Sequence, residues 1–236
     1  MTLVQTIQNA LLQYSTQERS KASQRFFKTG AGQYGEGDIF IGVTVPEQRR
    51  IAKQYAHDAT LEDIQELLQS KEHEFRLVAL MIMTYHYPKA SNAYKKELYD
   101  FYLAHTQWIN NWDLVDSSAG YIVGMYLSHT DISVLERLAQ SSSLWERRIA
   151  IIATFAFIKQ GYAEPTFAIA RLLLRDKHDL IHKAVGWMLR EVGKRCGEDV
   201  ERVFLDQHAT QMPRTMLRYA IERFPKETKT YYMQLK

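Results

Sequence analysis

The residues with the most evident chemical potential are a tryptophan and an aspartate four positions apart, Trp112 and Asp116. In a helix, this spacing brings both side chains onto one face. A carboxylate in a shielded site stabilises positive charge that develops in a transition state, and the face of an indole ring attracts a cation. Arg148 and Trp187 add a guanidinium group suited to phosphate and a second indole. Together these residue types suit a site that recognises a cation and assists its chemistry with an acidic group.

Each of these residues also has a structural interpretation. Tryptophans at helical spacing usually belong to a core. Asp116 could cap a helix or form a salt bridge, and Arg148 could pair with an acidic residue on a neighbouring helix. Periodicity alone therefore leaves both a catalytic and a structural role open.

The elements that must position these side chains are predicted to be helices. Apolar residues recur at helical spacing throughout the chain, as between Phe75 and Met83, and no segment reads convincingly as a strand. Thr60 and Ser143 are each followed three residues later by an acidic residue, which is the spacing of a helix N-cap and its capping partner. Three prolines lie where helices could begin: Pro46, Pro165 and Pro213.

A weak internal repeat sets the predicted architecture. Segments beginning at Arg76, Arg147 and Lys183 align with offsets of 71 and 36 residues, and the first offset is close to twice the second. Stepping by the same interval leads back from Arg147 to Asn111 and forward from Lys183 to Arg218. Each interval is long enough for two antiparallel helices. The repeat predicts an all-α fold, an α-solenoid of HEAT-like antiparallel helix pairs that is curved with a concave face.

The same register relates the chemical candidates to one another. Arg148 falls at the position equivalent to Trp112 one repeat later, and Trp187 lies three residues beyond the equivalent position in the next repeat. Neighbouring repeats place such helices side by side. We therefore expect Trp112, Asp116, Arg148 and Trp187 to converge on one patch, within a single domain over residues 1–236.

The distribution of charged residues along the chain says more about possible partners than the net charge does. The 236-residue chain has 30 basic and 27 acidic residues, so its net charge of +3 does not indicate a nucleic-acid binder by itself. Residues 145–195, however, include ten basic and five acidic residues. Such an excess suits a strip that faces phosphate, although a solvated helix face is a commoner cause. The candidates for phosphate contact in this stretch are Arg147, Arg148, Lys183 and Arg190.

Other features bear on location and cofactors. The longest apolar stretch, residues 149–158, is half of the roughly 20 residues that span a membrane, and the N-terminus lacks a secretory signal. One cysteine, Cys196, is too few for an internal disulfide, in agreement with a reducing compartment. We therefore expect a cytoplasmic protein that does not bind membranes. His178 and His182 have the spacing of metal ligands, but no third ligand is apparent and no metal is expected.

At these residues the chain resembles the AlkD-like family of DNA alkylation repair glycosylases. The likeness is carried by Asn111 to Ser117, by Trp145 to Arg148 and by Lys183 to Glu191, and a weaker likeness runs from about Lys21 to the last helices. Carried over by motif, the family's tryptophan and aspartate correspond to Trp112 and Asp116, its phosphate-contacting arginine to Arg148 and its second cleft tryptophan to Trp187. An N-terminal tyrosine of the family aligns with Phe26, which keeps the aromatic ring and lacks the hydroxyl.

The resemblance implies a monofunctional glycosylase that acts on duplex DNA containing N3- or N7-alkylated purines, without a metal or organic cofactor. In that mechanism Asp116 stabilises the sugar cation and orients water, Trp112 and Trp187 pack against the lesion, and Arg148 holds a phosphate. The protein is expected to act as a monomer.

Two alternatives stay open. One is a DNA-binding protein of the same fold without catalysis, and the other is a scaffold for protein interactions.

Overall fold

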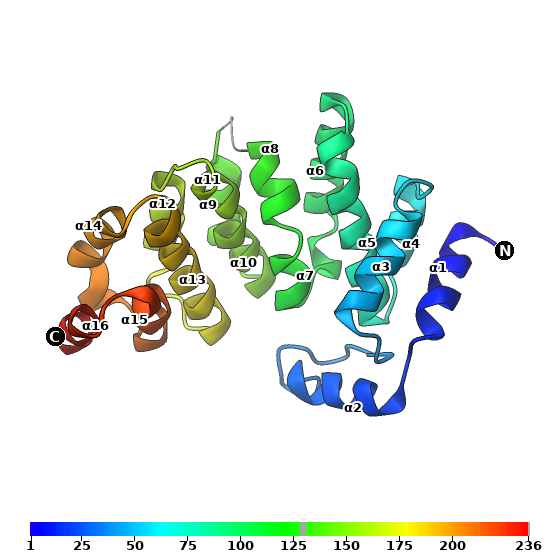
Figure 1. The fold of residues 1–236 in the computed structure, drawn as a ribbon, viewed down its shortest axis with the longest axis horizontal. Coiled ribbons are helices and arrows are strands. Elements are labelled where there is room, and N and C mark those ends of the chain that lie inside the picture. The colour runs from blue at the N-terminus through cyan, green and yellow to red at the C-terminus, as the bar shows by residue number, and fades with distance from the viewer. Residues whose placement is uncertain (128–130, 236) are drawn as a thin grey trace. The chain divides into compact units, whose positions relative to one another are not determined.

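The computed structural model describes residues 1–127 and 131–235, and its regular structure is helical (Figure 1). Within those ranges there is no strand, and one isolated bridge joins Ile39 to Glu72. The predicted all-α class is therefore confirmed. The chain folds as two compact units, Met1–Ser118 and Ala119–Lys236. The expectation of a single domain over the whole chain stays a prediction.

The first unit is built around α5, whose side chains are buried over most of its length. Helices α3 and α4 both pack against α5, and α1 packs against α3. Helix α2 differs from the others because none of its residues is buried. The helices of this unit are α1 (Leu3–Leu12), α2 (Gln17–Phe26), α3 (Val45–Tyr55), α4 (Leu61–Leu68), α5 (His73–His86), α6 (Asn92–Ala104) and α7 (Trp112–Asp116), with 3-10 turns at Tyr87–Lys89 and Thr106–Trp108.

The second unit is built around α13, which packs against α10, α12, α14 and α15. Helix α9 packs against α10 in the same way as α4 packs against α5. Its helices are α8 (Met125–Leu127), α9 (Ser133–Ala139), α10 (Leu144–Ala153), α11 (Phe155–Ile158), α12 (Glu164–Leu173), α13 (Asp179–Arg195), α14 (Glu198–His208), α15 (Arg214–Ala220) and α16 (Lys226–Gln234), with a π-helical turn at Gly120–Gly124 and 3-10 turns at Ala209–Gln211 and Ile221–Arg223. Within the described ranges, none of the helices has both the length and the apolar character needed to cross a membrane.

The helices begin where the sequence signals place them. The Thr60 side chain accepts a hydrogen bond from the Asp63 N–H, and the Asp63 carboxylate accepts one from the Thr60 N–H, which completes a capping box. Ser143 caps α10 by accepting from the Glu146 N–H. The three helix-starting prolines also lie as predicted: Pro46 and Pro165 lie in the first turns of α3 and α12, and Pro213 is the N-cap residue of α15.

One interaction recurs at the starts of α5, α10 and α13 and reveals the register of the repeat. In the first unit, Arg76 donates to the carbonyls of residues six and five positions before it. Arg147 does the same in the second unit, and its position 71 residues later matches the prediction. At the start of α13 the equivalent donor is His182, which bonds to the carbonyl of Asp176, six positions before it. We call this interaction the helix-start clamp.

This register corrects two details of the sequence analysis. The sequence of this helix start also suggests Asp179 as its N-cap, but the N-cap residue of α13 is His178. Because the N-cap of α10 is Ser143, the interval between the two helices is 35 residues and not 36. Lys183 is therefore equivalent to Arg148, and His182 is equivalent to Arg147. The error arose because a lysine resembles an arginine more than a histidine does.

Two glycines allow close approaches that position these helices. Gly42 has φ +81°, and a Cβ atom there would collide with the backbone of Thr16 and Ser20 at the start of α2. In the second unit, a Cβ atom at Gly186 would collide with the Met216 carbonyl, so α13 and α15 approach closely at that point. Any larger residue at either position would push the neighbouring helix away.

Candidate functional site

Helix α7 carries the two leading candidates at its ends. Trp112 is its first residue and Asp116 its last, so both lie on one face as predicted, and both are half-buried. The amide oxygen of Asn111 caps the helix by accepting from the Trp112 N–H at 2.8 Å. Burial raises the pKa of the nearby Tyr102 phenol, and the charge of Asp116 raises it further. The partial exposure of Trp112 favours a binding role over a purely structural one.

Aromatic rings in the first unit pack against Trp112. Its indole stacks on Phe27 with 5.2 Å between ring centroids, and Phe27 in turn stacks on Phe40 at 4.8 Å. Phe26 meets the edge of the Trp112 ring at 5.8 Å and is 65% exposed. The structure therefore brings two predicted residues, Phe26 and Trp112, into direct contact. The sequence analysis did not identify Phe27 and Phe40 as their support.

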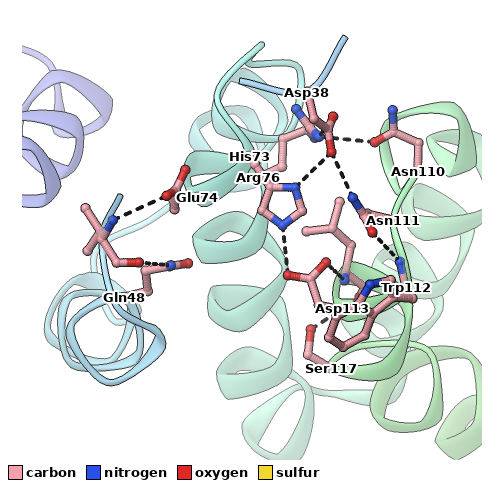
Figure 2. Close-up of polar contacts among 12 residues, drawn as sticks. Asp38, Gln48, His73, Glu74, Arg76, Asn110, Asn111, Trp112, Asp113 and Ser117 are labelled. Atoms are coloured by element: carbon pink, nitrogen blue, oxygen red, sulfur yellow. Dashed lines mark hydrogen bonds and ion pairs between the residues drawn. The ribbon is translucent and has the colours of Figure 1, made fainter. Parts of the chain in front are cut away.

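A buried polar network joins the start of α5 to the start of α7 (Figure 2). At its centre, the Asp38 carboxylate contacts Arg76 at 2.6 Å, His73 Nδ1 at 3.1 Å and the Asn111 amide nitrogen at 3.0 Å. The other ring nitrogen of His73, Nε2, lies 2.8 Å from the carboxylate of Asp113. The loop that contains Asp38, the start of α5 and the start of α7 are thus joined by hydrogen bonds directly beside Trp112.

The charges of this network stabilise one another. Burial by itself disfavours the charged form of His73, but the charge of Asp113 and hydrogen bonds to Asp113 and Asp38 outweigh it and raise the His73 pKa to about 9. Burial likewise disfavours ionised Asp38, but the hydrogen bond from His73 and the charge of Arg76 lower its pKa below the ordinary value. At neutral pH the network therefore contains two carboxylates, one guanidinium and one imidazolium.

The carboxylate of Glu74, on α5, binds the loop that leads into α3. Glu74 accepts hydrogen bonds from the N–H groups of three consecutive residues, 41–43, at 3.0, 2.8 and 3.3 Å. Beside this contact lies a cavity of about 240 Å³. Its walls include Arg19, Phe27, Phe40, Gln48, His73, Glu74 and Asp113. His73 and Asp113 therefore belong both to the polar network and to the wall of the cavity.

The predicted phosphate contacts of the second unit have partners inside the protein. Arg148 is 5% exposed and donates to the carbonyl of Leu180 at 2.5 Å. The other three form ion pairs: Arg147 with Asp176 at 2.6 Å, Lys183 with Asp179 at 2.7 Å, and Arg190 with Glu222. Trp187 lies on α13 and is half-buried. The expectation that Arg148 and Trp187 converge with Trp112 and Asp116 stays a prediction, since the two pairs belong to different units.

Two basic residues beside this group differ from it. Arg175 and Lys177 flank Asp176 in the loop before α13 and are exposed, and within the described residues neither forms an ion pair. The sequence analysis counted them in the basic stretch and did not single them out. Their availability could be inferred only once the partners of the other basic residues were known.

The histidine pair at His178 and His182 has a structural role. Nδ1 of His178 accepts from the Leu180 N–H, and Nε2 of His182 bonds to the Asp176 carbonyl at 2.5 Å. Across residues 1–127 and 131–235, no group of three potential ligands is arranged to hold a metal ion.

Comparison with known proteins relates this geometry to a family. No match is found among curated proteins. A solved structure described as a predicted DNA alkylation repair enzyme from Enterococcus faecalis is similar to the chain, with 16% identity and a TM-score of 0.68 over 90% of this chain and 97% of that one. The fold is therefore the α-solenoid of helix pairs that the repeat predicts. The model of the DNA alkylation repair enzyme family matches residues 7–224, and the chain belongs to that family.

Proposed function

We propose that the protein is a monofunctional DNA glycosylase that hydrolyses the N-glycosidic bond of N3- or N7-alkylated purines in duplex DNA. Family membership supports a role in alkylation repair. The observation that carries the more specific proposal is the pair at the ends of α7, a half-buried carboxylate and a half-buried indole on one helix face. Both side chains are partly exposed, and the indole stacks on Phe27.

The proposed chemistry follows from the charge of the substrate. Alkylation at N3 or N7 makes the purine cationic, so the bond from C1′ to the base breaks with its electron pair moving to the base, which leaves neutral. The deoxyribose becomes an oxocarbenium-like cation, which the negative charge of Asp116 stabilises. Water then adds to C1′ and releases its proton, either to Asp116 or to solvent. No step requires a metal or an organic cofactor.

Aromatic contacts supply recognition in this proposal. The exposed Phe26 and the half-buried Trp112 form a surface against which the lesion nucleotide packs, and the indole face attracts the cationic base or sugar. Trp187 is proposed as an aromatic contact of the second unit. Phe26 lacks the hydroxyl of the family's tyrosine, so its own contribution to recognition rests on stacking.

Phosphate contacts are proposed at the helix starts of the second unit. Arg147 and Arg148 lie in the early turns of α10 and Lys183 in the early turns of α13, where the helix dipole favours an anion. Arg190 is the more distant candidate. Because their charges are already engaged within the protein, we add Arg175 and Lys177 as phosphate contacts whose charges are not balanced by an ion pair.

The catalytic role of Asp116 can be tested by removing its charge. Asp116→Asn keeps the shape of the side chain and removes its charge, so base release should slow by about two to three powers of ten, as for other single electrostatic groups. Binding to duplex DNA should persist, because a repulsion from phosphate is removed. Single-turnover excision of N7-methylguanine measures the first quantity, and fluorescence anisotropy measures the second. Asp100→Asn is the control, because it removes the same charge from an exposed position on α6.

The outcomes separate the alternatives. If Asp116→Asn and Asp100→Asn both release base at the wild-type rate, Asp116 has no catalytic role. If wild type binds duplex DNA and releases no base, the protein is a non-catalytic DNA-binding member of its family. If it binds no DNA, the interaction-scaffold alternative gains support.

A further inference from the structure

We propose that His73 is a positioning residue for the reaction: its ring joins Asp38 to Asp113 and thereby sets the orientation of α7, which carries Trp112 and Asp116. This inference rests on the proposed function for its kinetic consequence. Its structural part, the control of the α7 orientation by His73, can be tested without activity.

Helix α7 cannot hold its own position, because it is only five residues long. Isolated helices shorter than roughly 12–15 residues are marginal in water, so most of the order of such a segment must come from tertiary contacts. Leu114 and Val115 bury its apolar side, and three polar or aromatic contacts hold its start. Asn111 donates to Asp38, Asp113 meets His73, and Trp112 stacks on Phe27.

His73 is suited to hold α7 in place because its own position in the fold is fixed. It is 1% exposed and is the first residue of α5, the most deeply buried helix of the unit. The main-chain N–H of His73 donates to the carbonyl of Ile39 at 2.8 Å, and the imidazole ring stacks on Phe40 with centroids 4.4 Å apart. Helix α5 is therefore the rigid base, and the His73 ring is the link from that base to Asp113 on α7.

The link depends on two protons. Nδ1 faces the Asp38 carboxylate and Nε2 faces the Asp113 carboxylate, and ionised carboxylates only accept hydrogen bonds. A neutral imidazole has one N–H, so it can donate to only one of the two aspartates. The doubly protonated ring satisfies both at once. Loss of its proton leaves a lone pair opposite a carboxylate and breaks one of the two links.

The charged groups around His73 favour the protonated ring. Asp38 faces it from the loop before α3, and Asp113 faces it from α7. Arg76, one turn along α5, opposes the charge of His73 and also neutralises Asp38. Glu74 and Arg19 line the same cavity. The pKa of His73, raised to about 9, agrees with a ring that is charged at neutral pH.

The direct test follows the environment of Trp112 as His73 titrates. A chain with Trp112 as its single tryptophan, made by replacing the other three with phenylalanine, would be studied by acrylamide quenching between about pH 7 and 10. Quenching should increase with pH, with a midpoint near the His73 pKa of about 9. In the same background, His73→Gln should abolish the transition. Quenching in the unsubstituted His73 chain that does not change over this range would overturn the proposal.

A kinetic test compares two histidines of the same helix. His73→Gln should slow single-turnover base release by about a hundredfold, the effect of a small misplacement of catalytic groups, and leave the dissociation constant for duplex DNA unchanged. His86→Gln is the matched control, because His86 is the last residue of α5 and its two hydrogen-bond partners, Tyr94 and Ala56, lie outside α7. If His73→Gln released base as fast as His86→Gln does, positioning by His73 would be excluded.

The two experiments also separate this proposal from the proposed function. If wild type releases no base while the Trp112 transition near pH 9 is present and is lost in His73→Gln, the positioning role stands and the glycosylase activity fails. If base is released and the transition is absent, the glycosylase activity stands and the positioning role fails.

Discussion

The starts of α5 and α10, 71 residues apart, have the same clamp in two different surroundings. In each, an arginine in the first turn bonds to two carbonyls of the preceding loop and pairs with an aspartate at 2.6 Å: Arg76 with Asp38, and Arg147 with Asp176. The side chain of Arg76 is 3% exposed and that of Arg147 18%. The shared part of the two clamps therefore serves the fold.

The difference lies in what else each aspartate binds. Asp38 also contacts His73 and Asn111, so the first clamp extends to α7 and its aromatic neighbours. The Asp176 carboxylate instead accepts from the N–H of His178, within its own loop. Part of this contrast lies at the first residue of the helix, which is His73 in α5 and Leu144 in α10. His73 and Asn111 together connect the first clamp to α7.

The largest expected effect comes from breaking the two clamps in parallel. Asp38→Ala leaves the buried Arg76 without its carboxylate and should lower the free energy of unfolding by about 3–5 kcal/mol. Asp176→Ala affects a more exposed arginine and should cost about 1–3 kcal/mol. Urea denaturation of both variants measures the contrast. Equal losses would mean that the greater burial of the first clamp has no energetic consequence.

The next largest effect is a pH dependence of the free energy of unfolding, which we expect from the His73 network beside the first clamp and not from the second clamp. The His73 pKa is about 9 in the folded protein, above the ordinary value of 6.5 in the unfolded chain. Its protonation therefore stabilises the fold fully below about pH 6.5, and this contribution is lost as pH rises through 9. The shift corresponds to a loss on the order of 3 kcal/mol. Urea denaturation of wild type and His73→Gln at several pH values measures this contribution. The difference between their free energies of unfolding should shrink as pH rises from about 6.5 to above 9.

The smallest effect, on DNA affinity, comes from the residues on either side of the two aspartates. Asp176 lies between Arg175 and Lys177, whereas Asp38 lies between a glycine and an isoleucine. If Lys177 contacts phosphate, Lys177→Ala should weaken binding to damaged and undamaged duplexes alike and reduce the slope of log affinity against log salt by about 0.9. Lys89→Ala is the control, because Lys89 lies beyond the far end of α5. Fluorescence anisotropy at several salt concentrations measures both, and identical slopes would exclude Lys177 as a contact.

Much of the fold could be predicted from the sequence because its signals are local. The capping pair at Thr60 and the prolines at helix starts act within one turn, and apolar periodicity identifies helices without knowledge of their neighbours. The 71-residue offset was correct because Arg76 and Arg147 have the same role. The next offset was one residue too long because His182 replaces the arginine, and a substitution that preserves function without preserving residue type cannot be recognised by alignment.

The site could be predicted only in part. Trp112 and Asp116 are recognisable because four residues separate them on one helix. His73 and Asp38 are not, because 35 residues separate them and only the folded chain brings a loop aspartate to the start of α5. Phe27 next to Phe26 was missed for a similar reason, since its importance comes from stacking on Trp112.

The helix-start clamp also bears on how far this fold can diverge. Its acceptors are main-chain carbonyls, which every sequence provides, and its donor is an arginine at Arg76 and Arg147 but a histidine at His182. A side chain with an N–H that reaches these carbonyls is therefore sufficient for the contact. A helix start built in this way can change its donor residue and keep its register. That tolerance is consistent with a shared fold at 16% identity with the Enterococcus faecalis structure.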